Sequence, residues 1–149
     1  MSETRAGVVV VGMHRSGTSA VTRVINLLGP SLGPSGDLYS AHDNPEHWES
    51  SALIACNDRV LERFGGSWWR PPVLPAGWQN SHTADELLPV ISESFDDIYG
   101  RTTGQWLWKD PRTCLTFPLW RRVLGSVVVV LVLRDSRDVV RSLSERDGL

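Results

Sequence analysis

Cysteine is scarce in this chain of 149 residues, and a long apolar run is missing. The two cysteines, Cys56 and Cys114, lie far apart without the spacing of metal ligands, so we interpret them as reduced thiols. The N-terminal residues lack the apolar core of a signal peptide, and the longest apolar run, 127–133, is too short to span a bilayer. These absences disfavour secretion and membrane insertion and favour a cytoplasmic protein.

A large excess of charge of one sign is also absent. The net charge is −2 and 41% of the residues are hydrophobic, which indicates one soluble globular domain over 1–149, or part of one. A near-neutral balance gives no general nucleic-acid footprint, so we expect no nucleic-acid partner. The positive charge that bears on function is therefore local.

The most informative segment is 9–18, with the sequence VVGMHRSGTS. A β-branched run gives way to a turn bounded by Gly12 and Gly17, and a helix follows, which is the form of a phosphate-binding loop. The spacing matches G-x-x-x-x-G-K-[ST], except that Thr18 stands where the phosphate-binding lysine belongs. The loop therefore predicts a cradle for a phosphate that is not itself transferred.

Apolar periodicity predicts alternating strands and helices. We expect strands over 6–11, 105–108 and 126–133, the last of them buried, and helices over 17–28, 51–64, 114–124 and 136–147. Thr83-x-x-Glu86 has the pattern of a capping box and predicts one more helix, although Pro89 lies near its start. Segments 30–50 and 68–82, rich in Gly and Pro, are expected to be loops. This alternation is typical of an α/β fold with a parallel sheet.

Cationic side chains follow all three predicted strands, in segments 12–18, 109–112 and 134–137. Because ligands of parallel sheets bind at the carboxyl ends of the strands, the three segments predict one site for a ligand with several anionic groups. Each segment alone has a simpler interpretation: an ordinary turn, a salt-bridged turn, or a helix start capped by Asp135 or Ser136.

Together these motifs resemble the sulfotransferase superfamily, whose sulfuryl donor is 3′-phosphoadenosine 5′-phosphosulfate. Residues 12–19 resemble the family's 5′-phosphosulfate loop, and residues 133–143 resemble its 3′-phosphate segment. In that segment an arginine and a serine eight residues later reach the 3′-phosphate, a spacing that Arg134 and Ser142 match. Tyrosylprotein sulfotransferases add an arginine where Arg146 stands and a Lys-Asp-Pro that 109–111 matches.

The resemblance implies a P-loop NTPase-like parallel sheet flanked by helices. It also implies in-line transfer of a sulfuryl group, without a metal, to a hydroxyl or amine of a small-molecule, carbohydrate or lipid acceptor. Arg15 would stabilise charge on the bridging oxygen, and Lys109 would neutralise the sulfuryl oxygens in the transition state. The residues implied to bind the donor are His14, Arg15, Ser16, Gly17, Thr18, Ser19, Arg134, Ser142 and Arg146.

The general base departs from the cytosolic members of the family, because Pro111 stands where they carry a histidine. Carbohydrate and tyrosylprotein members take a glutamate from the segment after the first helix. The candidates there are Asp37, His42, Asp43, Glu46, His47 and Glu49. We favour Glu49, because its neighbour Trp48 could desolvate the carboxylate and wall the acceptor site, with Glu46 and Asp37 next. The alternative is that Glu49 caps the helix expected from about residue 51.

Seven tryptophans are present. Trp106, Trp108 and Trp120 fall on predicted core elements, whereas Trp68, Trp69 and Trp78 lie in the proline-rich loop and could line an acceptor pocket.

Family members continue well beyond the 3′-phosphate segment, so we expect a fold that is incomplete at its C-terminus, from the N-terminal portion of a longer protein or a natural truncation. Two other functions stay open. A kinase-like phosphotransferase is disfavoured by Thr18 at the lysine position. The other is a truncated, non-catalytic nucleotide-binding or interaction domain.

Overall fold

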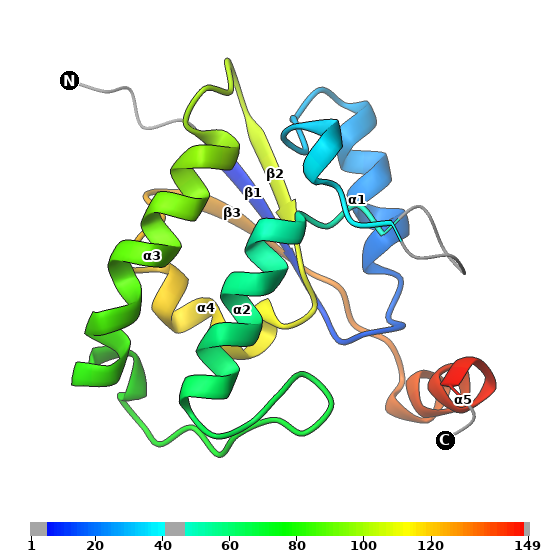
Figure 1. The fold of residues 1–149 in the computed structure, drawn as a ribbon. Coiled ribbons are helices and arrows are strands. Elements are labelled where there is room, and N and C mark those ends of the chain that lie inside the picture. The colour runs from blue at the N-terminus through cyan, green and yellow to red at the C-terminus, as the bar shows by residue number, and fades with distance from the viewer. Residues whose placement is uncertain (1–5, 41–46, 148–149) are drawn as a thin grey trace.

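The centre of the fold is a parallel sheet of three strands. The computed structural model describes residues 6–40 and 47–147. The strands are β1 (Gly7–Val11), β2 (Trp106–Lys109) and β3 (Val127–Leu131), in the order β2-β1-β3 (Figure 1). The central strand β1 is paired in parallel with both neighbours, so Val9 stands opposite Trp108 on one side and Val129 on the other. The expected α/β fold with a parallel sheet is confirmed.

Helices cover both faces of this sheet. Helix α1 (Thr18–Leu27) packs on one face, whereas α2 (Ser51–Arg63), α3 (His82–Tyr99) and α4 (Thr113–Trp120) lie on the other (Figure 1). Helix α5 (Ser136–Asp147) stands apart, beyond the carboxyl ends of the strands. Two short 3₁₀ turns, Ser35–Asp37 and Trp78–Asn80, interrupt the long connections. Within the described parts of the chain, no helix has the length and apolarity needed to cross a membrane.

The core is divided between the two faces because successive strand residues point in opposite directions. Val9 and Trp108 belong to the larger cluster, which packs under α2, α3 and α4, while Val10 and Leu107 belong to a smaller one under α1. Trp106, Trp108 and Trp120 lie in the larger cluster, as expected. Trp78 lies there too, with its ring 4.9 Å from Phe64 in an edge-to-face contact, so it packs the core and is not a pocket residue.

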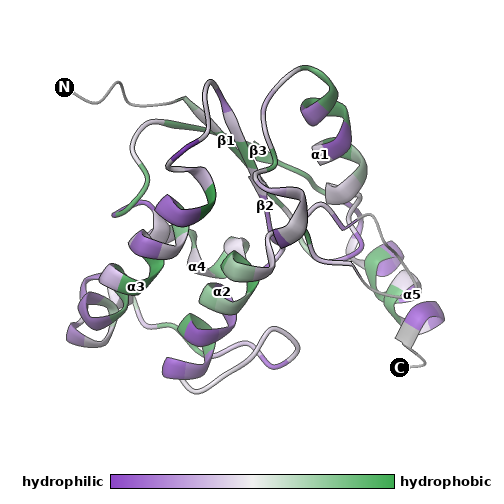
Figure 2. Ribbon diagram, turned by 45° about the horizontal axis from the view of Figure 1, so that its top comes forward, coloured by the Kyte–Doolittle hydropathy of each residue, from purple (hydrophilic) through white to green (hydrophobic). Residues whose placement is uncertain are grey.

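Strand β3 corrects the expectation of a buried strand over 126–133. It forms one edge of the sheet, and Val128 and Leu131 are 61% and 59% exposed. Figure 2 shows that β3 is as hydrophobic as β1, although its outer edge is paired with no described strand. Hydrophobicity alone predicted burial, but a strand is buried only where neighbours cover it.

Two helix boundaries also differ from the expectation. The cap of α3 is Ser81, whose hydroxyl accepts a hydrogen bond from the backbone N–H of Ala84 over 3.2 Å, so the capping box expected at Thr83 is wrong. The helix includes Pro89 in its interior. Helix α4 ends four residues earlier than expected, at Trp120.

Candidate functional site

The loop between β1 and α1 has a backbone that only certain residues can adopt. A Cβ atom on Gly12 would lie 2.7 Å from the carbonyl oxygen of Val132, so this position requires glycine. Arg15 (φ 65°) and Gly17 (φ 95°) are both left-handed, a conformation that is costly for arginine. Gly17 is the N-cap of α1 and offers no side chain to the first N–H groups of the helix. Those donors can therefore bind an anion.

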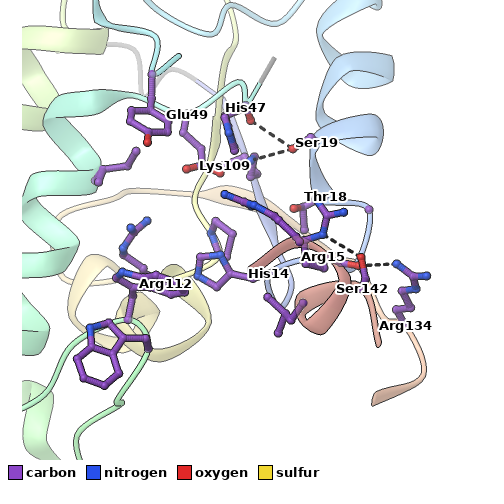
Figure 3. A pocket seen from close by; sticks show the side chains of 18 of the residues that line it. His14, Arg15, Thr18, Ser19, His47, Glu49, Lys109, Arg112, Arg134 and Ser142 are labelled. Atoms are coloured by element: carbon purple, nitrogen blue, oxygen red, sulfur yellow. Dashed lines mark hydrogen bonds and ion pairs between the residues drawn. The ribbon is translucent and has the colours of Figure 1, made fainter. Parts of the chain in front are cut away.

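A cavity of about 920 Å³ lies beside this loop (Figure 3). Ten of the predicted site residues line it: His14, Arg15, Gly17, Thr18, Ser19, Glu49, Lys109, Arg134, Ser142 and Arg146. Ser16 does not line it, because its hydroxyl is turned into the loop and donates to the carbonyl of Met13 over 2.6 Å. The three strand ends thus meet at one cavity, whose volume suits a small-molecule ligand.

The cationic end of the cavity joins segments that are more than a hundred residues apart. Arg15 Nε donates to the hydroxyl of Ser142 over 2.9 Å, and Arg134 Nη1 donates to the carbonyl of Arg15 over 2.8 Å (Figure 3). Both guanidinium groups therefore lie at the β1–α1 loop. Their side chains are exposed enough to meet a ligand from solvent.

The other charged groups of segment 135–141 are bonded locally. The Asp135 carboxylate accepts from the backbone N–H of Arg137 over 2.9 Å, so Asp135 caps α5. The Arg137 side chain is paired with the same carboxylate, and Arg141 is paired with Asp138. The simpler interpretation of this segment, a capped and solvated helix start, holds for these residues but not for Arg134.

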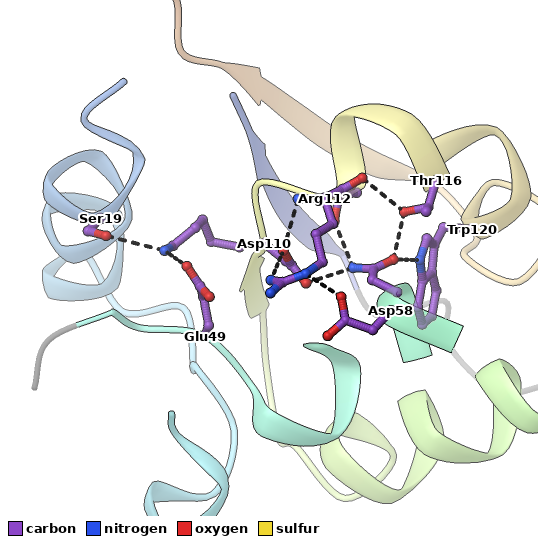
Figure 4. Close-up of polar contacts among 10 residues, drawn as sticks. Ser19, Glu49, Asp58, Asp110, Arg112, Thr116 and Trp120 are labelled. Atoms are coloured by element: carbon purple, nitrogen blue, oxygen red, sulfur yellow. Dashed lines mark hydrogen bonds and ion pairs between the residues drawn. The ribbon is translucent and has the colours of Figure 1, made fainter. Parts of the chain in front are cut away.

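A buried ion pair forms another part of the cavity wall. Lys109 is the only lysine of the sequence, and its ammonium group is paired with the Glu49 carboxylate. Lys109 Nζ also donates to the hydroxyl of Ser19 over 3.2 Å, which connects β2 to the first turn of α1 (Figure 4). Both side chains are almost completely buried.

Burial shifts the acid–base properties of both groups in this pair. Removal from water raises the pKa of Glu49 above that of an ordinary carboxyl, although the charge of Lys109 opposes this. Burial likewise lowers the pKa of Lys109, against the opposing charge of Glu49. Each group is therefore closer to exchanging its proton near neutral pH than a solvated side chain would be.

Glu49 does not cap α2, contrary to one of the two interpretations of the sequence. The hydroxyl of Ser50 accepts from the N–H of Leu53 over 3.2 Å, and Asp37 Oδ1 accepts from the N–H of Ala52 over 3.0 Å. These two side chains satisfy the first turn of the helix. The Glu49 side chain is left to face the cavity and Lys109.

The other base candidates separate into three groups. Asp37 is held at the start of α2 and does not line the cavity. His47 lines it, and its carbonyl accepts from the hydroxyl of Ser19 over 3.4 Å. Glu46, like His42 and Asp43, lies outside the described residues.

The Trp48 ring, expected to wall the acceptor site beside Glu49, lies elsewhere. It packs on the smaller core cluster, with the guanidinium of Arg23 4.9 Å from its centre, and it does not line the cavity. Trp48 instead has a left-handed backbone (φ 57°), directly before Glu49. Its contribution to the site is therefore one of backbone shape.

A second polar network, missed by the sequence analysis, supports the end of β2 (Figure 4). Arg112 lines the cavity, and its guanidinium donates to Asp58 over 2.7 Å and to Asp110 over 3.1 Å. Asp110 in turn accepts from the amide of Asn57 over 2.8 Å. The Lys-Asp-Pro-Arg sequence predicted a charged turn. Its partners Asn57 and Asp58 could not be predicted from the sequence, because they lie on another element, helix α2.

Asn57 is the centre of this network. Its side chain is completely buried and its carbonyl oxygen accepts from Thr116 over 2.6 Å and from the indole N–H of Trp120 over 2.8 Å. Its amide donates to Asp110 and to the hydroxyl of Thr113. One side chain thus fixes both α4 and the turn that follows Lys109 and carries Arg112.

Comparison with known proteins adds no assignment. No protein-family model matches this chain, and no match is found among the curated proteins either. The interpretation of the site therefore depends on the residues and the geometry described above.

Proposed function

We propose that this chain carries the donor-binding site of a sulfotransferase, which transfers a sulfuryl group from 3′-phosphoadenosine 5′-phosphosulfate to an acceptor hydroxyl. The observation that supports this most strongly is the meeting of two anion-binding segments. The β1–α1 loop would hold the 5′-phosphate, and Arg134 and Ser142, which contact that loop through Arg15, are suitably placed for a second phosphate nearby. A ligand with two separate phosphates would occupy both segments at once.

The proposed reaction uses the buried pair as well as the loop. The acceptor oxygen would attack sulfur, the bond from sulfur to the bridging oxygen would break, and the electron pair would leave on the 5′-phosphate. Arg15 would stabilise charge on that oxygen, and Lys109 would stabilise the sulfuryl oxygens. The acceptor proton would pass to Glu49, whose raised pKa suits a general base.

A kinase-like phosphotransferase is the weaker alternative. Thr18 replaces the loop lysine, and the next hydroxyl, that of Ser19, would be the metal ligand in such enzymes. Here the ammonium group of Lys109 is 3.2 Å from this hydroxyl, a position that would repel a divalent cation. A non-catalytic nucleotide-binding domain is the third possibility, and it would not need the buried pair at the cavity.

Calorimetric titration with adenosine 3′,5′-bisphosphate and with ATP, each with and without Mg²⁺, tests the proposal. We expect the bisphosphate to bind without metal and more tightly than ATP. Metal-dependent binding of ATP would instead support the phosphotransferase, and binding of neither nucleotide would contradict both. If the bisphosphate binds but no acceptor is ever sulfated, the non-catalytic domain is the better description.

A further inference from the structure

The cavity extends well beyond the groups proposed to bind the donor. Arg112 lies at the far side from Arg134 and Ser142, with His14 between them (Figure 3). The lining there also includes two of the three tryptophans of the proline-rich loop, Trp68 and Trp69. This end, defined by Asp58, Trp68, Trp69 and Arg112, is called the acceptor end below.

The aromatic groups of the acceptor end offer open flat faces. Trp69 is 70% exposed although it lines the cavity, and Trp68 is half-exposed with its ring 5.0 Å from that of His14. Exposed indole rings at a cavity mouth provide rigid contact area for the apolar face of a ligand. An enclosed apolar slot of the kind that suits a phenol is not formed by these residues.

The charged groups at the acceptor end and directly beside it nearly balance one another. The Arg112 guanidinium is held between the carboxylates of Asp58 and Asp110, and Glu49 and Lys109 form a pair, so these five groups sum to −1 when all are charged. No described residue is bonded to Asp58 Oδ2 or to Arg112 Nη2. These atoms offer one hydrogen-bond acceptor and one donor on two neighbouring residues that line the cavity.

We propose that the acceptor is a sugar, specifically a pyranoside without acidic groups. This inference rests on the proposed sulfotransferase function. A pyranose ring would pack its apolar face on Trp69, while two neighbouring hydroxyls would bind the Asp58 carboxylate and the Arg112 guanidinium. The phosphates of the bound donor would neutralise Arg15, Arg134 and Arg146 at the other end of the cavity, so the remaining charge of −1 disfavours a sugar that carries a carboxylate or sulfate. Asp58 and Arg112 are then specificity residues and need not touch the reacting atoms.

Saturation-transfer NMR on the whole chain, with the bisphosphate present, tests the proposal. The probes are methyl pyranosides of gluco, galacto and manno configuration, the corresponding methyl uronates, and 4-methylphenol. We expect at least one neutral pyranoside to bind, and its uronate to bind about 10-fold more weakly. The proposal is overturned if no pyranoside binds, if the uronates bind as tightly, or if the phenol is preferred.

Two variants separate the sugar site from a merely structural network. Trp69→Ala should weaken pyranoside binding by about 3- to 10-fold, whereas Val73→Ala, fully exposed in the same loop, should not. Asp58→Asn should weaken binding of the neutral pyranoside. It should also reduce the difference in affinity between that pyranoside and its uronate, because it removes the charge that repels the uronate. Its matched control is Asp85→Asn. The Asp85 carboxylate forms an ion pair of 2.8 Å with Arg122, and neither residue lines the cavity.

The possible results also distinguish failure of the sugar proposal from failure of the proposed sulfotransferase function. If the bisphosphate binds and no sugar does, the acceptor assignment is wrong and the donor site stands. If a sugar binds and its binding depends on Trp69 and Asp58, but the bisphosphate does not bind, the sulfotransferase assignment is wrong. An unchanged preference in Asp58→Asn would overturn the specificity role of that residue.

Discussion

Arg15 Nε donates a hydrogen bond to Ser142 Oγ over 2.9 Å, although the two residues are 127 positions apart in the chain. Arg15 has a left-handed backbone, and its carbonyl accepts from Arg134. Helix α5 and Arg134, two residues before it, therefore help to hold the β1–α1 loop in a conformation that arginine alone would disfavour. We therefore expect the loop and α5 to act as one anion-binding surface.

Arg134 is predicted to distinguish nucleotides by their 3′-phosphate. A charge-assisted hydrogen bond contributes about 1.5–3 kcal/mol, so Arg134→Ala should weaken binding of the bisphosphate by roughly 10- to 150-fold. Adenosine 5′-phosphosulfate, which lacks the 3′-phosphate, should bind nearly as before. Calorimetry with both ligands measures this, and Arg137→Ala, whose side chain is paired with Asp135, is the matched control. Equal losses for both ligands would mean that Arg134 only shapes the loop through the Arg15 carbonyl.

Substitution of Glu49 is predicted to lower turnover, whereas substitution of Asp37 is predicted to lower stability. Glu49→Gln should lower turnover by roughly 10²–10⁴ on an identified acceptor, because it removes the base, and the residual rate should lose its acidic pH limb. Asp37→Ala should instead lower the free energy of unfolding by about 1 kcal/mol, because it removes a helix cap, with turnover little changed. Steady-state kinetics and urea unfolding of both variants check this. A fully active Glu49→Gln enzyme would rule out Glu49 as the base.

The buried pair makes the stability of the protein depend on pH in a defined direction. In Glu49→Gln, Lys109 loses the partner that raises its pKa, so the folded-state pKa should fall further below the ordinary lysine value. A depressed folded-state pKa means that the unfolded chain binds more protons, so stability is lost as the pH falls. The deficit of the variant against the wild type should therefore grow as the pH is lowered from about 10 to 7.

Two measurements test this pH dependence. Urea unfolding across that pH range gives the difference in the free energy of unfolding between Glu49→Gln and the wild type. Because the sequence has one lysine, a sample labelled with ¹³C at lysine Cε gives one titrating side-chain signal. A deficit that does not change with pH, or a Lys109 midpoint that does not fall in Glu49→Gln, would show that the two groups are not coupled.

Asn57 is predicted to be the most sensitive polar position for stability. Asn57→Ala would remove one hydrogen bond each from Asp110 and Thr116 and would leave the buried indole N–H of Trp120 without its partner, which should lower the free energy of unfolding by about 3 kcal/mol. The exposed Asn80→Ala is the control. Thermal or urea unfolding compares the two, and similar stabilities would mean that water replaces the lost bonds.

Much of this fold could be predicted from the sequence because local signals agree with one another. The apolar run before Gly12, the glycines that end it and the periodic residues after it all indicated a strand, a turn and a helix, and these are present. The burial of β3 could not be predicted, because burial depends on neighbours and not on the strand's own hydrophobicity. The start of α3 was missed because Ser81 and Thr83 are both good caps and packing selects between them.

The site was predictable only in part, for a similar reason. The carboxyl ends of parallel strands meet, so the gathering of Arg15, Lys109 and Arg134 at one cavity followed from the topology. Glu49 was selected for its neighbour Trp48, yet that ring packs elsewhere. Asn57 and Asp58 were missed because their partners are more than fifty residues away, and no spacing along the chain records such a contact.

The exposed edge of β3 has a practical consequence for handling the protein. Five consecutive apolar residues, Val127–Leu131, present unpaired backbone groups along one side, and no described strand covers them. Such an edge is a template on which a second chain can add a strand, and segments of this composition aggregate readily. Solubility should therefore fall steeply with protein concentration, and a lysine or proline placed at an outward position of β3 should relieve it.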